Sequence, residues 1–293
     1  PIDLPGTTSL QDIWYGSGIP VDASKGLADA HAHHIERTPS DGPISIAVVQ
    51  NEAAMKAEGD LETAYQGRDL PFEVSLYHDL TADELEALLQ SDHDFLHYIG
   101  HVGEAGIDCA DGRLDTRTVD DVAIDAFLLN ACQSYEQGVG LIQAGSIGGV
   151  VTINDVVNAE AVTVGKNLAK LLYRGFPLSV ARDLATAESV IGDLYLTLGD
   201  GEVTLTQTES GTALYGEITT SGAAPEADVI AYPTRSGGMG SMLFPNLPEN
   251  DVHYLNSGRL DLSTEAVMDS FSLEDMPVLV DGRLFWSQDE EFE

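Results

Sequence analysis

Apolar residues along the middle of the chain gather in short runs that are typical of buried strands. The runs are rich in β-branched and aromatic residues, and stretches with helical spacing separate them. They comprise ISIAVVQ at 44–50, FEVSLYHDL from Phe72, DFLHYIG at 94–100, DAFLLN at 125–130 and IGGVVTIN at 147–154. Strands that alternate with helices require a sheet covered on both faces, so the pattern predicts an α/β fold with a mostly parallel sheet.

Helical periodicity and helix-end signals fall between these runs. Thr81 and Glu84 have the spacing of a capping box in front of an apolar helical stretch. Gly145 and Gly175 stand where glycines commonly end helices. The pattern predicts five helices. They lie at 51–65, in the stretch that begins at residue 81, in a short stretch that ends at Gly145, at 158–174 and at about 178–190.

The two ends of the chain have a different character. Residues 1–43 mix Gly, Pro and His, which predicts loops and one short helix. Within the middle region, Asp111-Gly112 is a hairpin signal. From about residue 193, strand and turn patterns such as YLTLGDGEVTLTQ predominate. We therefore expect an N-terminal extension at 1–43, an α/β domain at 44–192 and a β-rich C-terminal region at 193–293.

Charge narrows the classes of partner. Forty-nine Asp and Glu against 13 Lys and Arg give a formal net charge of −36 in a chain of 293 residues that is 43% apolar. The acids are dispersed along the chain, as in proteins of salt-loving organisms, in which concentrated salt screens the repulsion between surface carboxylates. Such a surface repels phosphate backbones and anionic lipid, so we expect neither nucleic acid nor a membrane as a partner.

The chain has two cysteines, Cys109 and Cys132, and no stretch approaches the roughly 18 apolar residues that a membrane span needs. No signal-peptide pattern stands at the start. We expect a cytoplasmic protein with free thiols, and a chain that opens at Pro1 is also compatible with a piece of a longer protein.

Thiol catalysis needs a sulfur nucleophile, a base and backbone donors for the oxyanion. His101 follows the third predicted strand, and Cys132 follows the fourth. Loops at the carboxyl ends of neighbouring parallel strands meet at one edge of the sheet, so these two side chains converge if the strands are neighbours. The backbone N–H groups of Val102 and Cys132 are then the candidate oxyanion donors.

The candidate dyad lies in two motif-like segments, LHYIGHVG at 96–103 and LLNACQSYEQG at 128–138. The first resembles a strand that ends in His-x-x-Gly-His-Gly, and the second resembles the Leu-Ser-Ala-Cys-Gln segment, of the CHAT family in the caspase-like clan. The order of elements over 140–185 is also similar to that family, so the resemblance covers about 44–190. The whole chain resembles CHAT-type proteins of halophilic archaea.

This resemblance implies a caspase-like three-layer sandwich with a mostly parallel sheet of about six strands, plus the β-rich extension. It also implies cleavage of peptide bonds by a dyad of His101 and Cys132, without a metal or cofactor.

Three positions bear on specificity. Val102 stands where many relatives have Gly, which would crowd the substrate carbonyl while leaving the backbone N–H in place. Asn130 stands where some relatives carry an acid that receives a basic P1 side chain, so this position does not support specificity for Arg or Lys. Asn130 and Asp155, which lies in the loop after the fifth strand, are candidate residues of the substrate pocket, although Asp155 is equally consistent with a solvated acid.

Structural roles compete with these functional ones. Cys132 is alternatively a buried, inert thiol, and His97 is better explained as a packed core residue. His31, His33 and His34 invite a metal hypothesis, but no cysteine or well-spaced acid completes such a site.

Three functions stay open on these grounds. A cysteine endopeptidase in regulated proteolysis, acting on a protein or peptide substrate or on itself, with room for a regulatory protein partner, is favoured. A catalytically silent CHAT-fold scaffold or protein-binding module is the alternative; Val102 favours it and the retained His101–Cys132 pair opposes it. A small-molecule hydrolase or acyltransferase that uses the same dyad is the third.

Overall fold

The computed structural model describes residues 11–38, 42–51, 70–156, 158–208, 212–221, 225–232, 258–260, 267–268, 271 and 275–288. The chain divides into two compact units, which are Pro1–Tyr173 with Pro177–Leu205 and Arg174–Phe176 with Thr206–Glu293. The helix predicted at 51–65 lies outside the described residues, apart from its first position.

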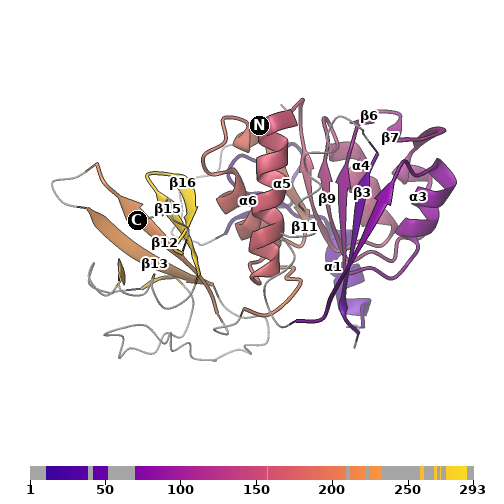
Figure 1. The fold of residues 1–293 in the computed structure, drawn as a ribbon. Coiled ribbons are helices and arrows are strands. Elements are labelled where there is room, and N and C mark those ends of the chain that lie inside the picture. The colour runs from indigo at the N-terminus through magenta and orange to yellow at the C-terminus, as the bar shows by residue number, and fades with distance from the viewer. Residues whose placement is uncertain are drawn as a thin grey trace. The chain divides into compact units, whose positions relative to one another are not determined.

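The first unit is built on one large sheet, shown in Figure 1. In order across the sheet, its strands are β1 (Ile13–Trp14), β2 (Ser24–Lys25), β11 (Tyr195–Gly199), β10 (Gly148–Thr152), β9 (Ala126–Asn130), β5 (Phe95–Ile99), β3 (Ile44–Gln50) and β4 (Phe72–His78). The five strands from β10 to β4 are parallel to one another, and β11 is antiparallel to β10. The mostly parallel sheet is therefore confirmed. It has two short strands more than expected, because part of the N-terminal segment pairs at one edge.

Helices cover both faces of this sheet (Figure 1). One layer contains α1 (Ala28–Glu36), α3 (Ala82–Leu89) and α4 (Tyr135–Ala144), whose buried side chains share an apolar core with alternate residues of the sheet. The other layer contains α5 (Asn158–Tyr173) and α6 (Leu178–Thr186). The predicted three-layer α/β sandwich is confirmed.

Alternation along β5 explains why its run of residues is apolar almost throughout. Leu96 and Tyr98 belong to the core under α3 and α4, and the alternate residues of the strand, His97 among them, point to the opposite face. All five residues of the strand are buried, because each face of the sheet carries a helical layer. A strand buried on both faces leaves only its ends for chemistry.

Several predicted helix ends are confirmed. Thr81 and Glu84 form a reciprocal capping box at the start of α3. Gly145 follows α4 with a φ of 146°, and a Cβ there would lie 2.2 Å from the Val122 carbonyl oxygen, so only glycine fits. α6 ends at Thr186, four residues before the predicted end, and a 3₁₀ turn, η3 (Gly192–Leu194), leads into β11.

A small antiparallel sheet follows β5. It consists of β6 (Val102–Gly103), β7 (Gly106–Cys109) and β8 (Gly112–Leu114), and a 3₁₀ turn, η2 (Thr116–Thr118), comes after it. Cys109 pairs with Gly112, so the turn residues are Ala110 and Asp111, one position earlier than the Asp-Gly signal indicated.

The boundary between the units falls later than residue 192. β11 was expected to belong to the β-rich extension, but it pairs with β10 over five residues and so completes the first unit. The second run of its predicted hairpin, from Val203, forms no strand. The second unit carries a sheet in the order β14 (Gly258–Leu260), β13 (Glu226–Tyr232), β12 (Ala213–Thr219), β15 (Pro277–Val280) and β16 (Arg283–Trp286).

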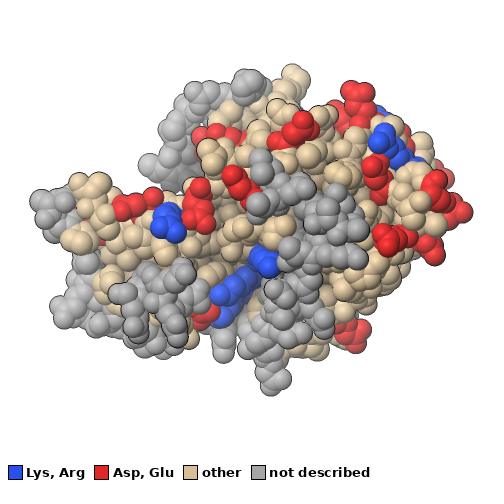
Figure 2. Space-filling model, turned by 45° about the horizontal axis from the view of Figure 1, so that its top comes forward, with Lys and Arg blue, Asp and Glu red and all other residues tan. Residues whose placement is uncertain are grey.

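Acidic side chains of the described residues are scattered over the face in Figure 2, and basic side chains occupy a few places among them. This distribution agrees with the dispersion of Asp and Glu along the sequence. Within the described ranges, no helix combines the length and apolar character that crossing a bilayer requires.

Candidate active site

Strand register brings His101 and Cys132 to the same edge of the sheet. β5 and β9 are parallel neighbours, paired from Phe95 opposite Ala126 through Ile99 opposite Asn130. His101 stands two residues after the end of β5, and Cys132 stands two residues after the end of β9. The His101 side chain is exposed and that of Cys132 is half-buried. The expectation that these two strands are neighbours is confirmed, and Cys132 is a partly exposed residue.

A buried tyrosine holds the segment that carries His101. The Tyr98 hydroxyl lies 3.2 Å from the His101 carbonyl oxygen and 2.9 Å from that of Asp108, to which it donates. The Asn51 amide also donates to the Asp108 carbonyl, at 3.1 Å. A Cβ on Gly100 would lie 2.5 Å from the Tyr98 oxygen, so glycine is what lets the chain pass over the ring. Tyr98 thus fixes the backbone on which the imidazole stands.

The pairing of β6 with β7 determines where the Val102 amide points. The Asp108 N–H donates to the His101 carbonyl at 2.9 Å, and Val102 lies opposite Ile107. In an antiparallel ladder this pattern makes Val102 and Ile107 a pair without direct hydrogen bonds, so the Val102 N–H points away from β7. The Val102 side chain, 8% exposed, packs in the core and does not stand over the site. The crowding expected from this valine is therefore not observed.

The turn that carries Cys132 is tied to the end of β10. The Ser134 hydroxyl donates to the Leu129 carbonyl at 3.0 Å and accepts the Thr152 N–H at 2.9 Å. Gln133 has a φ of 51°, unusual for a residue other than glycine, and its N–H donates to the Asn154 carbonyl at 3.2 Å. A residue held in this region by its neighbours commonly marks a functional turn.

The Cys132 sulfur contacts the backbone of Val156. The Val156 N–H donates to the sulfur at 3.4 Å, and the sulfur lies 3.8 Å from the carbonyl oxygen of the same residue. These two contacts join the turn that carries Cys132 to the loop after β10.

The two candidate pocket residues lie in different environments. Asp155 is exposed and accepts a hydrogen bond from the Gln133 side chain at 2.9 Å, so its carboxylate is close to the turn that carries Cys132. Asn130 is 1% exposed; its amide donates to the Ala161 carbonyl at 2.8 Å, and its oxygen accepts from the Tyr195 hydroxyl at 2.9 Å. Asn130 therefore joins α5 and β11 to β9 inside the fold, because alternation directs its side chain beneath α5, and it does not reach a surface pocket.

His97 and Cys109 have the structural roles that the sequence favoured. His97 is fully buried, and burial lowers its pKa to about 3. Cys109 is a free thiol in the small sheet, and burial, the main cause, raises its pKa to about 11. Neither group is suited to act at neutral pH, since the imidazole does not gain a proton there and the thiol does not lose one.

Two of the three N-terminal histidines bond to residues outside the candidate site. His31 Nε2 lies 2.7 Å from the Tyr15 hydroxyl, and His34 bonds to the Asp200 carboxylate. In the part of the chain that the structure describes, no three His, Cys, Asp or Glu side chains gather as metal ligands would.

Sequence reasoning missed the residues that support the site. Tyr98, Ser134 and Val156 act through contacts between segments that lie 10 to 24 residues apart or on different strands. Only Ser134 gave a local signal, since it stands in front of a helical stretch, where a cap residue is expected.

No protein-family model matches the sequence, and no curated protein matches it significantly. Among solved structures, the Arg-specific cysteine proteinase gingipain R (RgpB) has a TM-score of 0.47 at 12% identity, over 71% of this chain and 62% of that chain. The complex of the Porphyromonas gingivalis RgpB pro- and mature domains has a TM-score of 0.46 at 12% identity, over 69% and 59%. The Saccharomyces cerevisiae separase–securin complex gives 0.43 at 12% identity, over 58% and 13%.

This chain therefore spans less than two thirds of the length of each of these chains. The likeness is loose, so we base the function on the residues and strand register of this chain.

Proposed function

We propose that the protein is a cysteine endopeptidase of the caspase-like clan with a dyad of His101 and Cys132. The observation that carries the proposal is the register of β5 and β9, which puts both residues two positions beyond the paired ends of adjacent parallel strands. In this mechanism His101 takes the proton from the Cys132 thiol, and the thiolate attacks a peptide carbonyl carbon. The protonated imidazole then gives its proton to the leaving amine, and water hydrolyses the acyl-enzyme to release the acid and the thiol.

The negative oxygen of the tetrahedral intermediate needs preorganised donors. The Val102 N–H is suited to this, because it points away from β7 and belongs to the residue next to His101. In the turn after β9, the Ala131 and Gln133 amides donate to the Leu129 and Asn154 carbonyls. The Cys132 amide lies between them at the reacting sulfur, so we propose it as the second donor.

The substrate in this proposal is a protein or peptide, or the chain itself, and a regulatory protein partner is in keeping with the resemblance to CHAT proteins. We assign the catalytic domain to residues 44–192 with β11 as its completing strand. We propose that Asp155 lines the substrate pocket, since it is exposed and accepts a hydrogen bond from Gln133. Asn130 is left out, because its side chain is buried and both of its polar atoms are bonded.

We also propose a cytoplasmic protein adapted to concentrated salt. The net charge of −36 produces strong self-repulsion in dilute buffer, and salt screens it. Assays of this chain are therefore best made in about molar salt, at which the Debye length is roughly 3 Å.

The proposal is tested with a labelled peptidyl electrophile that traps active thiolates. Wild-type protein and Cys109→Ala protein are expected to form one covalent adduct each, and Cys132→Ala protein is expected to form none, as measured by intact-protein mass spectrometry. Cys109→Ala is the matched control, because it removes the other thiol of the chain.

An adduct that persists in Cys132→Ala protein, or no adduct in the wild type, would contradict the assignment. The absence of any Cys132-dependent adduct would favour a binding or scaffold module. Labelling at Cys132 together with a failure to cleave any member of a peptide library would favour a hydrolase or acyltransferase of small molecules.

A further inference from the structure

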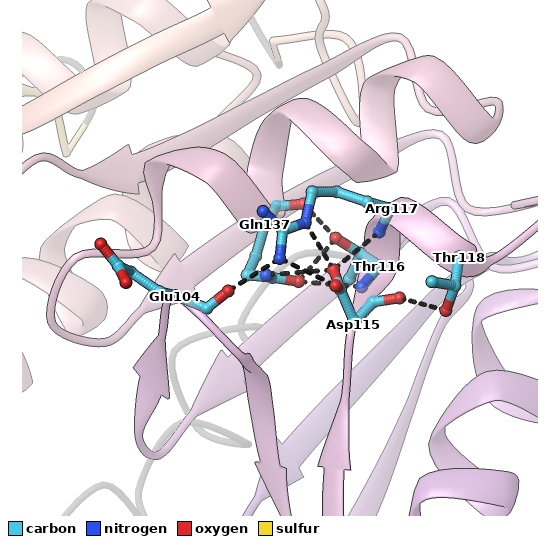
Figure 3. A network of polar contacts seen from close by, with 6 residues as sticks. All are labelled: Glu104, Asp115, Thr116, Arg117, Thr118 and Gln137. Atoms are coloured by element: carbon cyan, nitrogen blue, oxygen red, sulfur yellow. Dashed lines mark hydrogen bonds and ion pairs between the residues drawn. The ribbon is translucent and has the colours of Figure 1, made fainter.

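The segment after His101 and the helix after Cys132 are joined by a polar network, drawn in Figure 3. Arg117, in η2, is its central residue. Its guanidinium donates to the Glu104 carbonyl oxygen at 2.8 Å, and Glu104 lies in the β6–β7 turn, three residues after His101. The same guanidinium forms two bonds to the Asp115 carboxylate, at 2.7 and 2.8 Å. A fork with this geometry fixes direction as well as distance.

The network continues from Asp115 to α4. The Gln137 amide donates to Asp115 Oδ1 at 3.3 Å, and Gln137 Oε1 accepts the Thr116 N–H at 2.8 Å. The Thr116 hydroxyl lies 2.7 Å from the Gln137 carbonyl oxygen. Gln137 is fully buried and lies five residues after Cys132. Buried, well-satisfied polar groups of this kind hold one arrangement in preference to others.

Close packing supports the same link. A Cβ on Gly140 of α4 would lie 2.4 Å from the Thr116 hydroxyl, so glycine allows η2 to lie directly against the helix. The Asp115 carboxylate stays ionised over the whole working range, because its hydrogen bonds with Arg117, the largest cause, lower its pKa to about 2. The carboxylate therefore stays charged as an acceptor for both Arg117 and Gln137.

We propose that Arg117 is a positioning residue of the active site, which fixes the segment that carries His101 against the helix that follows Cys132. The inference rests on the proposed dyad. Arg117 does not touch the reacting atoms; it acts through the Glu104 carbonyl on one side and through Asp115 and Gln137 on the other. Displacing a catalytic group by about 1 Å can cost up to about 10²-fold in rate, so this link has kinetic consequences.

The test compares variants in a Cys109→Ser background, so that Cys132 is the one thiol to react. Arg117→Ala removes the link. Arg113→Ala is the matched control, because Arg113 is four residues before Arg117 and is likewise about half-exposed, yet its 2.6 Å bond to Asp108 joins β8 to β7 and does not reach α4. Two experiments are made on folded protein. Peptide hydrolysis gives kcat and KM, and iodoacetamide alkylation gives the reaction rate of Cys132 from about pH 5 to about 9, where imidazoles and activated thiols titrate.

Arg117→Ala is expected to lower kcat by about tenfold or more while KM changes less than about threefold, as for a displaced catalytic group. The alkylation profile of Arg117→Ala should lose its low-pH reactivity and approach that of His101→Ala. Arg113→Ala should stay within about twofold of the parent in both measurements. If Arg117→Ala does not fold, Arg117→Lys keeps the charge but not the fork and should shift both readouts in the same direction.

Unchanged kcat and an unchanged alkylation profile in the Arg117 variants would overturn the positioning role. That outcome is distinguishable from failure of the dyad, in which His101→Ala itself leaves the alkylation profile of Cys132 unaltered. In the latter case the proposed peptidase mechanism falls, and the positioning role falls with it.

Discussion

The same residue type has different surroundings in the interior of the sheet and at its carboxyl edge. His97 and His101 are four residues apart on one continuous segment, but His97 is fully buried with a pKa lowered to about 3, whereas His101 is exposed. Both cysteines lie outside the interior of the large sheet and are half-buried. Cys109 is in the small sheet, where burial raises the pKa of its thiol to about 11, and Cys132 follows β9 beside the Val156 amide.

The contrast shows that residue type alone does not identify the candidate site. A side chain within a doubly covered strand is desolvated, and desolvation suppresses the charged form of an imidazole or a thiolate. A side chain just beyond the strand end keeps access to solvent and substrate, while the paired strand fixes its backbone. Chemistry is therefore expected at strand ends, and the predictions below test this difference.

The largest effect is expected from replacing His101 and His97 separately. His101→Ala should lower kcat/KM by about 10²- to 10⁴-fold, the usual contribution of a general base, with little change in unfolding free energy. His97→Ala should instead cost roughly 2–4 kcal/mol of unfolding free energy through the cavity that it leaves. The kcat/KM of folded His97→Ala protein should stay within about threefold of the parent. Peptide hydrolysis and denaturant unfolding, both in concentrated salt, give the two quantities.

A reversed pattern, with His97→Ala inactive but stable and His101→Ala fully active, would place the base inside the sheet. The dyad would then have to be withdrawn.

The next effect concerns acid stability. The pKa of His97 is 6.5 in the unfolded chain and about 3 in the folded protein. At pH values between these two, the unfolded chain binds a proton at His97 and the folded protein does not. The pKa is lower in the folded state, so this histidine makes the unfolding free energy fall as pH decreases through that window, by up to about 1.4 kcal/mol per pH unit. His97→Leu should remove that contribution and flatten the curve of unfolding free energy against pH.

Leu128→Ala is the matched control for this measurement, because Leu128 is the strand neighbour of His97 and does not titrate. It should lower stability by a similar amount at every pH, as a cavity does. If His97→Leu gives only such a parallel offset, the imidazole is not held neutral in the folded protein.

The smallest effect separates two buried tyrosine hydroxyls. Tyr98→Phe removes the donor to the His101 and Asp108 carbonyls, and Tyr195→Phe removes the donor to Asn130. Each should cost roughly 1 kcal/mol of unfolding free energy, since each leaves a buried acceptor with fewer bonds. Only Tyr98→Phe should also lower kcat, by about threefold to tenfold, because only that hydroxyl holds the segment bearing His101. Equal kcat values for the two variants would remove Tyr98 from the support of the site.

Local patterns predicted most of the first unit correctly. The buried strands, the capping box at Thr81 and the glycine after α4 are each specified within a few residues, by periodicity or by backbone conformation. Contacts between distant segments were not predictable in this way. The burial of Asn130 was not predictable, because which face of β9 lies beneath α5 depends on the packing of the helix, and Tyr195, its partner, is 65 residues away.

The amino-acid sequence by itself determined the alternation of strands and helices, the strongly acidic surface and the location of His101 and Cys132 just after two strands, because each of these follows from composition or local spacing. The tertiary structure alone decided that β5 and β9 pair in the register that levels these residues, that Val102 packs inward, and that Arg117 joins the two segments. These features depend on strand pairing and side-chain contacts across the fold, whose free energies are shared among residues far apart along the chain.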